Sequence, residues 1–292
     1  MSTQNPIKNT IKALKQQYDS LRRGKDSLLQ IIDEAEISEV VYNSNAIENS
    51  TLTLKETERI LLEMEVSRNV SLREVFEAKN LARVVEYIRG KSREVEISKE
   101  YIVLLHNMLI GNINDTIAGR FRKQGEYVRV GTYIAPAPEY VENMIEEIIS
   151  EYTSEHDVYF MDKIARFHLD FETIHPFNDG NGRIGRVLIN DQLQRLGFPG
   201  VIIRDKEKQR YYRGFHEYRD RKNTKPMEKV LTLALTESLH KRIAYLESKS
   251  IIPLIKYARR LHKSAPTMLN AARRQSIPAF REKGVWKIAA DD

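Results

Sequence analysis

The feature that most constrains the fold is a helical period that recurs along nearly the whole chain. Apolar residues return every three or four positions through most of the 292 residues, and the period-two alternation of strands is rare. We expect a mainly α-helical protein with helices over 27–48, 71–89, 98–110, 140–152, 161–174, 183–196, 206–219 and 226–246. The exception is EYVRVGTYIAP, residues 126–136, which predicts a short β-hairpin.

The first residues carry a second helical pattern. Gly24 interrupts it after about two heptads. We interpret it as a helix that packs on its own protein, and a dimer seam is the alternative. The apolar positions are Ile7, Ile11, Leu14, Tyr18 and Leu21. Further on, Thr53 and Glu56 have the spacing of a capping box and predict another helix start.

Composition excludes several classes of protein. The chain has no cysteine, so disulfide scaffolds, thiolate zinc sites and cysteine nucleophiles are ruled out. Its polar start does not resemble a signal peptide, and no apolar run approaches the roughly 18 residues that a bilayer requires, so we expect a cytoplasmic protein. Residues 251–292 hold nine basic and three acidic side chains, which accounts for the whole formal charge of +6.

Residues 175–186, HPFNDGNGRIGR, bring a histidine, a carboxylate, three glycines and two arginines close together. A helix leads into His175, and Pro176 favours its end there. Gly180, Asn181 and Gly182 would then open the next helix, where unpaired backbone N–H groups and the helix dipole favour an anion. Glycines let phosphate oxygens approach the backbone closely. The motif therefore predicts a phosphate-binding joint between two helices.

The other polar residues of the motif fit the same ligand. Arg183 and Arg186 are three positions apart, so both guanidinium groups can face a polyphosphate. Asp179 is suited to hold a magnesium ion that bridges phosphates. His175 is the residue whose unperturbed pKa suits proton transfer near neutral pH.

Two other interpretations of this region are weaker. Gly180, Gly182 and Gly185 match the dinucleotide pattern GxGxxG, but that pattern needs a preceding strand and a βαβ unit, and here a helix precedes. A metal site formed by His168 and His175 is also disfavoured, because His168 lies on an apolar helical face and is expected to be a core histidine.

These residues carry a family resemblance. HPFNDGNGRIGR resembles the active-site motif of the Fic family, HPFx(D/E)GNGRxxR, at every fixed position, and a weaker similarity runs from about Ser98 to Leu246. The resemblance implies a Fic fold, a helical bundle with a short β-hairpin flap. It also implies a nucleotidyltransferase that moves AMP from ATP to a Tyr, Ser or Thr hydroxyl of a protein.

The resemblance also implies roles for individual residues. His175 would be the general base, Phe177 would anchor the loop, and Asp179 would bind magnesium. The anion hole would come from Asn181 with its neighbouring glycines. Arg183 and Arg186 would hold the outer phosphates, and the retained GNGR sequence favours adenylyl transfer over kinase activity.

The resemblance also implies residues that contact the nucleotide base and the target protein. Tyr211 and Tyr212 match a tyrosine pair near the base in the family, although half-buried structural aromatics are an equal alternative. Where relatives often have an asparagine seven residues after the pair, this chain has Arg219. The hairpin at 126–136 corresponds to the flap that pairs with the target backbone, and Val130 and Gly131 are assigned to the nucleotide site.

SNAIEN, residues 44–49, bears on control. Ser44 and Glu48 are four apart and share a helix face that ends at Asn49. Without the other motif this would be a solvated helix end. Beside it, the stretch matches the family's inhibitory pattern (S/T)xxxE(G/N), which implies that Glu48 pairs with Arg186 in place of the γ-phosphate.

The basic C-terminal segment predicts a small winged-helix or helix-turn-helix unit. Pro266 and Thr267 open a helix bearing Arg273 and Arg274, and a hairpin follows around Gly284. Concentrated positive charge suits DNA phosphates. The alternative is a basic cap that packs on the core or mediates a homodimer.

We therefore expect an N-terminal region with the inhibitory helix at 1–97, a Fic core at 98–248 and a winged-helix-like domain at 249–292. The function expected is autoinhibited AMP transfer from ATP with Mg²⁺. The alternatives are a DNA-binding regulator that senses nucleotide, and a Fic enzyme that removes AMP or transfers another nucleotide.

Overall fold

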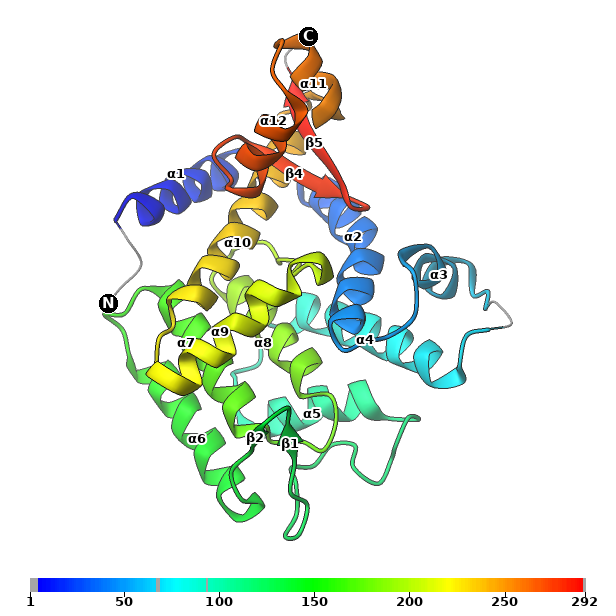
Figure 1. Ribbon diagram of the computed structural model, residues 1–292, viewed down its shortest axis with the longest axis vertical. Coiled ribbons are helices and arrows are strands. Elements are labelled where there is room, and N and C mark those ends of the chain that lie inside the picture. Colours follow the sequence, from blue (N-terminus) through cyan, green and yellow to red (C-terminus); the bar gives the residue numbers. More distant parts are fainter. Residues whose placement is uncertain (1–4, 67–68, 93, 291–292) are drawn as a thin grey trace.

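The computed structural model describes residues 5–66, 69–92 and 94–290 and confirms a mainly helical protein (Figure 1). The longer helices of the first two thirds of the chain are α1 (Asn5–Leu21), α2 (Asp26–Ile47), α4 (Leu72–Lys91), α5 (Lys99–Ile110), α6 (Pro138–Ser154), α7 (Phe160–Ile174) and α8 (Asn181–Arg195). They are followed by α9 (Lys208–Arg221) and α10 (Lys225–Leu246). None of the described helices is long and apolar enough to span a membrane.

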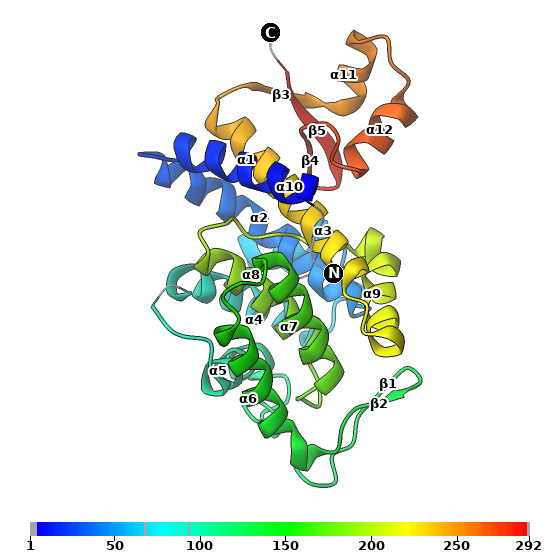
Figure 2. The same ribbon diagram turned by 90° about the vertical axis from the view of Figure 1, so that its left-hand side faces the viewer.

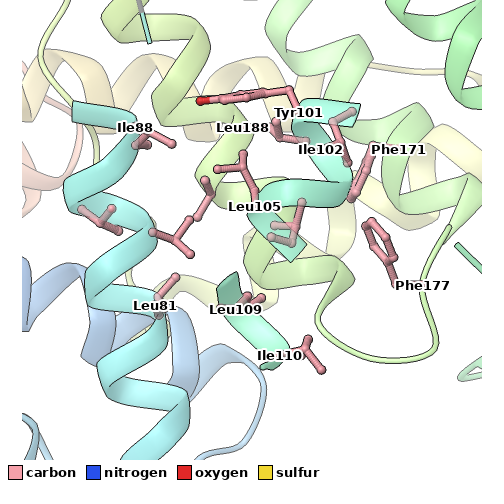
Figure 3. Packing of buried hydrophobic residues seen from close by; sticks show 14 of the residues in the cluster. Leu81, Ile88, Tyr101, Ile102, Leu105, Leu109, Ile110, Phe171, Phe177 and Leu188 are labelled. Carbon is pink, nitrogen blue, oxygen red and sulfur yellow. The ribbon is translucent and has the colours of Figure 1, made fainter. Parts of the chain in front are cut away.

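One apolar core lies between α4, α5, α6, α7 and α8. The apolar faces of α4 and α5 meet there, with Leu81 and Ile88 directed towards Leu105 and Leu109 (Figure 3). Phe171 of α7 and Phe177 of the following loop complete the far side, and both side chains are fully buried. This core holds the joint between α7 and α8 in place.

A second core brings the N-terminal helices against α7, α9 and α10. Ile11 and Tyr18 of α1 are buried here, and α1 packs along α10. Figure 2 shows α1 and α2 lying across the upper part of α10. The interpretation of the first helix as one that packs on its own protein is confirmed.

Capping interactions mark several helix starts, and the capping box among them was predicted. Ser98 and Ser71 cap α5 and α4 by accepting from backbone N–H groups, and Thr53 with Glu56 forms the capping box. The helix that this box opens, α3 (Leu54–Glu58), is short and passes into a π-helical segment over Arg59–Glu63.

Other expected boundaries were wrong by a few residues. Helix α9 starts at Lys208 after a 3₁₀ turn over Asp205–Glu207, two residues later than expected. In the 126–136 segment, only β1 (Arg129–Val130) and β2 (Tyr133–Ile134) pair, so the regular hairpin is shorter than expected.

The last 41 described residues form a separate apolar cluster. Strand β3 (Ser250–Pro253) was not predicted; it is followed by α11 (Leu254–Arg260) and α12 (Ala265–Arg273). The hairpin of β4 (Ala279–Glu282) and β5 (Val285–Ala290) turns at Lys283 and Gly284, as predicted around Gly284. The three strands form an antiparallel sheet in the order β3-β5-β4.

Candidate active site

His175 lies where α7 ends. The α7 helix stops because Pro176 follows, and His175 takes a left-handed conformation, with φ of 51°. Its backbone N–H donates to the Phe171 carbonyl over 2.9 Å. Burial lowers the pKa of His175 to about 4, so the imidazole is neutral near pH 7. A neutral imidazole can accept a proton.

The following loop is fixed by Phe177 and Asn181. The Phe177 ring stacks on His106 with a centroid separation of 3.7 Å. The Asn181 amide accepts from the Phe177 N–H at 2.9 Å and donates to the Phe177 carbonyl at 2.8 Å. The Asn181 side chain therefore closes the loop on itself.

Helix α8 begins at that point, and the backbone N–H groups of its first turn form a candidate anion site. Gly180 precedes it with φ of 84°, a conformation that favours glycine. Because the first turn of a helix has no intrahelical acceptor for its N–H groups, the backbone of residues 181–183 can donate to an anion. The side chain of Asn181 is engaged elsewhere, so the backbone would supply this part of the anion hole.

Arg186 faces the N-terminal helix. Its Nη2 donates to Glu48 Oε1 at 2.8 Å and to the Ser44 carbonyl at 2.8 Å, and its Nε donates to Ser44 Oγ at 2.9 Å. Glu48 also lies against α8, since a Cβ at Gly182 would be only 2.2 Å from Oε1. The Glu48 carboxylate therefore sits over the anion site, and Asn49 follows with φ of 68° and ends the segment.

Arg183 and Asp179 belong to a neighbouring group of charges. Arg183 lies 3.0 Å from Asp179 Oδ1 and 3.3 Å from Glu77 Oε1, and Arg73 donates to Asp179 Oδ2 at 2.6 Å. Burial raises the pKa of Asp179, but the charges of Arg183 and Arg73 outweigh it and keep the pKa below its usual value. Asp179 is therefore ionised and oriented at the edge of the loop.

A magnesium ion fits this donor set in one way. The described residues contain no group of three metal-ligating His, Asp or Glu side chains, and Asp179 offers one carboxylate. Magnesium is often held by one or two carboxylates with phosphate oxygens and water. Asp179 suits the ion only together with a bound polyphosphate. Arg73 would then have to release Asp179 Oδ2, to which it donates in this structure.

The two tyrosines of α9 form hydrogen bonds to His168 of α7 and to the end of α2. Tyr211 is buried and its hydroxyl lies 2.7 Å from His168 Nε2. Tyr212 donates to the Ile47 carbonyl at 2.7 Å, directly before Glu48. Burial lowers the pKa of His168 to about 3, so it is a neutral interior histidine. In this conformation Tyr212 anchors the end of α2.

The flap lies beside the end of α7. Val130 and Gly131 are at its tip, and the Tyr133 hydroxyl donates to the Thr173 carbonyl at 3.2 Å. The Arg219 guanidinium lies 5.1 Å from the centre of the Tyr133 ring, so the position that departs from the family pattern contacts the flap. Tyr127 and Ile134 are 63% and 67% exposed, leaving apolar surface beside the strands.

Sequence reasoning missed two residues that shape this site. The buried Arg122 donates to the carbonyls of Ile174, His175, Glu126 and Pro136 and so joins the flap to the end of α7. Glu172 is a buried carboxyl with its Oε2 atom 3.9 Å from His175 Nδ1. Arg122 had no motif to mark it, whereas Glu172 lies one helical turn before His175, a spacing that could have drawn attention.

Comparison with known proteins gives a consistent result. The model of the family described as Fic/DOC matches residues 96–193. A protein adenylyltransferase Fic of Nematostella vectensis is 31% identical over 242 residues, covering 80% of this chain and 54% of that protein. Protein adenylyltransferase fic-1 of Caenorhabditis elegans is 33% identical over 183 residues, covering 60% of this chain and 35% of that protein. The chain thus spans about half or less of these curated relatives.

Solved structures show the same fold. A Fic domain containing signaling protein from Bacteroides thetaiotaomicron superposes with a TM-score of 0.75 at 26% identity, covering 82% of this chain and 98% of that one. A Fic family protein from Desulfovibrio desulfuricans, at 19% identity, has a TM-score of 0.67 and covers 99% of this chain and 98% of its own. The segment matched by the family model, residues 96–193, includes the His175 loop and the start of α8. This chain carries a Fic domain and belongs to the Fic/DOC family.

Proposed function

We propose that this protein is an adenylyltransferase that moves AMP from ATP to a hydroxyl group of a protein. The observation that carries the proposal is the neutral imidazole of His175 in the loop that leads into the glycine-bounded N-terminus of α8. A base and an anion site so placed suit attack on a phosphate ester. The names of the related proteins support the same reaction.

The proposed reaction is a direct transfer of the adenylyl group to a hydroxyl oxygen. The target Tyr, Ser or Thr hydroxyl oxygen attacks the α-phosphorus, His175 accepts the hydroxyl proton, and pyrophosphate leaves. Arg183, Arg186 and the N–H groups of residues 181–183 would hold the phosphates. Asp179 would hold a magnesium ion, which supplies charge neutralisation when bound. Tyr211 and Tyr212 remain proposed contributors to the nucleotide site, as do Val130 and Gly131.

We also propose that the described conformation is an inhibited one. Ser44 and Glu48 use the Arg186 donors that a γ-phosphate would need, and Glu48 lies over Gly182. A buried arginine that is paired with a carboxylate is not available to phosphate. Adenylyl transfer then requires the end of α2 and Glu48 to move away.

The reaction class is tested by labelling. Protein is incubated with α-labelled ATP and magnesium and separated on a gel, with the chain itself as acceptor. Label should enter Glu48→Gly, and the double variant with His175→Ala should take up none. If removal of the imidazole leaves labelling intact, His175 is not the base. If label is released from pre-modified protein instead of added, AMP removal is the correct alternative.

A second candidate function, DNA binding, is favoured by one surface. A groove of about 1110 Å³ separates α12 from α9 and α10. Its cationic lining residues are Arg210, Arg213, Lys225, Lys229, Arg273 and Arg274, against Glu217 and Glu228. The strand and helix order of residues 250–290 supports the winged-helix interpretation. Cations on both walls suit a phosphate backbone.

Binding of a fluorescent DNA duplex, followed by anisotropy over a salt series, tests this candidate. The Arg273→Ala/Arg274→Ala variant should bind more weakly and with a shallower salt slope than the parent. Arg259→Ala/Arg260→Ala is a matched control, since these exposed arginines of α11 do not line the groove. Absence of binding at low salt would exclude DNA.

A further inference from the structure

Glu172 is a buried acid for which the proposed reaction has so far no use. It lies on α7, and its side chain is 11% exposed. Among the described residues, Oε1 has no hydrogen-bond partner. A Cβ at Gly185 of α8 would lie 2.4 Å from Oε1, so the carboxyl is pressed against the backbone of the next helix. An unpaired polar atom in such a place is costly and calls for an explanation.

The neighbour of this carboxyl is the proposed base. Glu172 Oε2 lies 3.9 Å from His175 Nδ1, and Nδ1 is buried without a side-chain hydrogen-bond partner, although the Glu172 backbone raises the pKa of the imidazole. The two groups face each other at a separation that a small rotation of either side chain would close to a hydrogen bond. Each supplies what the other lacks, since a carboxyl oxygen accepts in either protonation state and an Nδ1–H donates.

This geometry matters for proton transfer because the two imidazole nitrogens are not equivalent. If Nδ1 carries the proton and is held by an acceptor, Nε2 is left free to take a proton from a substrate. A base oriented by a third group is a recurring arrangement in nucleophilic catalysis. We propose, on the basis of the adenylyltransferase function above, that Glu172 is a positioning residue that accepts from His175 Nδ1–H and keeps Nε2 as the proton acceptor.

The charges around Glu172 link this role to Glu48. Burial first and the Glu48 carboxylate second raise the pKa of Glu172 to about 8, against the lowering effect of Arg186. The titratable and charged groups that face Glu172 are His168 on α7, His175 directly after it, Glu48 after α2, Arg186 on α8, and Tyr211 and Tyr212 on α9. Removal of Glu48 takes away one negative charge, so ionisation of Glu172 becomes easier in the released state.

An ionised Glu172 would in turn favour a proton on His175. Burial lowers the pKa of that imidazole, and Arg122 and Arg219 lower it further. A carboxylate next to Nδ1 opposes these effects and makes His175 a better base. Glu48 itself raises the pKa of His175, so its departure would free the phosphate site and leave Glu172 as the carboxylate that supports the base.

The test uses the full chain with Glu48→Gly, so that the site is open. Glu172→Leu removes the acceptor, and Glu172→Gln keeps an acceptor without the charge. Asp170→Asn is the matched control, because Asp170 is also a largely buried acid of α7 but bonds to the Tyr218 hydroxyl. The rate of self-labelling in a single turnover and the ATP concentration for half-maximal rate are measured from pH 5.5 to 9.

Glu172→Leu should slow transfer by about 10- to 100-fold with the half-saturating ATP concentration within about twofold. Glu172→Gln should fall between Leu and the parent and should lose the part of the rate increase with pH that Glu172 ionisation causes. The Asp170→Asn rates should match the parent. If both Glu172 variants keep the parent's rate and pH profile, Glu172 does not position the base.

A second readout does not depend on activity. With ¹⁵N-labelled histidine, the ring nitrogen shifts of His175 report which nitrogen carries the proton. Glu48→Gly should show protonated Nδ1, and the double variant with Glu172→Leu should lose that preference while remaining folded by thermal unfolding. An unchanged tautomer overturns the inference. If Glu48→Gly transfers no AMP but the tautomer depends on Glu172, the proposed reaction fails and the positioning contact stands.

Discussion

At the scale of single residues, the buried Glu172 makes stability depend on pH. Burial, and to a lesser extent the Glu48 carboxylate, raises its pKa in the folded protein to about 8 from an ordinary value of 4.5. The folded chain therefore holds a proton there that the unfolded chain has lost, and this contribution to stability falls as pH rises through that interval. Glu172→Gln removes the titration. Urea unfolding at pH 5.5 and 8.5 should show the variant gaining stability relative to wild type at the higher pH.

The comparison with wild type at each pH is essential in this experiment. His106, His168 and His175 have pKa values lowered by burial, so their contributions rise with pH in the acidic range and oppose that of Glu172. The contribution of His106, which does not contact Glu172, cancels in the difference between the two proteins. A difference that stays constant from pH 5.5 to 8.5 would show that Glu172 does not titrate in this interval.

Residues whose role is local were predictable from sequence, and those whose role depends on distant partners were not. Thr53 with Glu56 and the glycines after Asp179 act within a few positions of themselves, and a pattern reveals them. Arg122 contacts carbonyls more than fifty residues away, at His175 and Ile174. No short-range pattern carries that information. Glu48 is an intermediate case, because its pairing with Arg186 was expected only from the family resemblance.

At the scale of elements, the N-terminus of α8 is where a small side chain matters most. A methyl group at Gly182 would meet Glu48 Oε1 and Arg186 Nη1, which are ends of flexible side chains. Gly182→Ala should displace Glu48, yet the methyl would also occupy space that phosphate needs. We expect weaker ATP binding by calorimetry in the Glu48→Gly background. Gly90→Ala, with no atom within 4 Å of its new Cβ, is the control.

The outcome separates two explanations of inhibition. If displacement of Glu48 were sufficient, Gly182→Ala alone would label itself as strongly as Glu48→Gly. We expect labelling to remain near that of wild type, because the anion site itself is altered. Strong labelling by Gly182→Ala would show that phosphate does not approach this turn.

The helices were predicted from the sequence, whereas strand β3 was not. Every helix expected after residue 26 is present, because each has its own apolar period, and the helices that start after Thr53, Ser71 and Ser98 also have a side-chain cap. Strand β3 was missed, because its four residues become a strand only by pairing with β5, where Ser250 lies opposite Ala290. The pairing is antiparallel and spans nearly the whole C-terminal segment, so short-range patterns do not reveal it.

At the scale of the whole molecule, a buried charge network joins α2 to α10 and to the C-terminal sheet. Arg242 of α10 contacts Asp33 at 2.5 Å and Glu36 at 2.7 Å, both on α2. Glu39 of α2 contacts Arg204, which also reaches Glu237 of α10, and Glu237 binds Arg281 of β4. Helix α2, which leads into the Ser44–Glu48 segment, is thus joined by ion pairs to α10 directly and to strand β4 of the C-terminal sheet through Arg204 and Glu237.

Loss of one partner in this network should be costly. Arg242→Met leaves Glu36 with Lys241 alone and Asp33 without its arginine, and removal of one member of a buried pair costs about 3–5 kcal/mol. Chemical denaturation should show a loss of that order. Lys91→Met, in an exposed pair with Glu94, is the control and should leave the denaturation midpoint close to that of wild type. Equal effects would mean that the network adds no more than a surface pair.

The central claim is that Glu48 blocks the phosphate site while the catalytic loop is already formed. The most direct test is the single-turnover rate of AMP transfer by Glu48→Gly divided by that of wild type, with Glu34→Gln, an exposed acid of the same helix, as control. If the contact with Arg186 favours the blocked state by about 3 kcal/mol, the ratio should be roughly 100, and the control should stay near one. An equal or lower rate for Glu48→Gly would contradict the account.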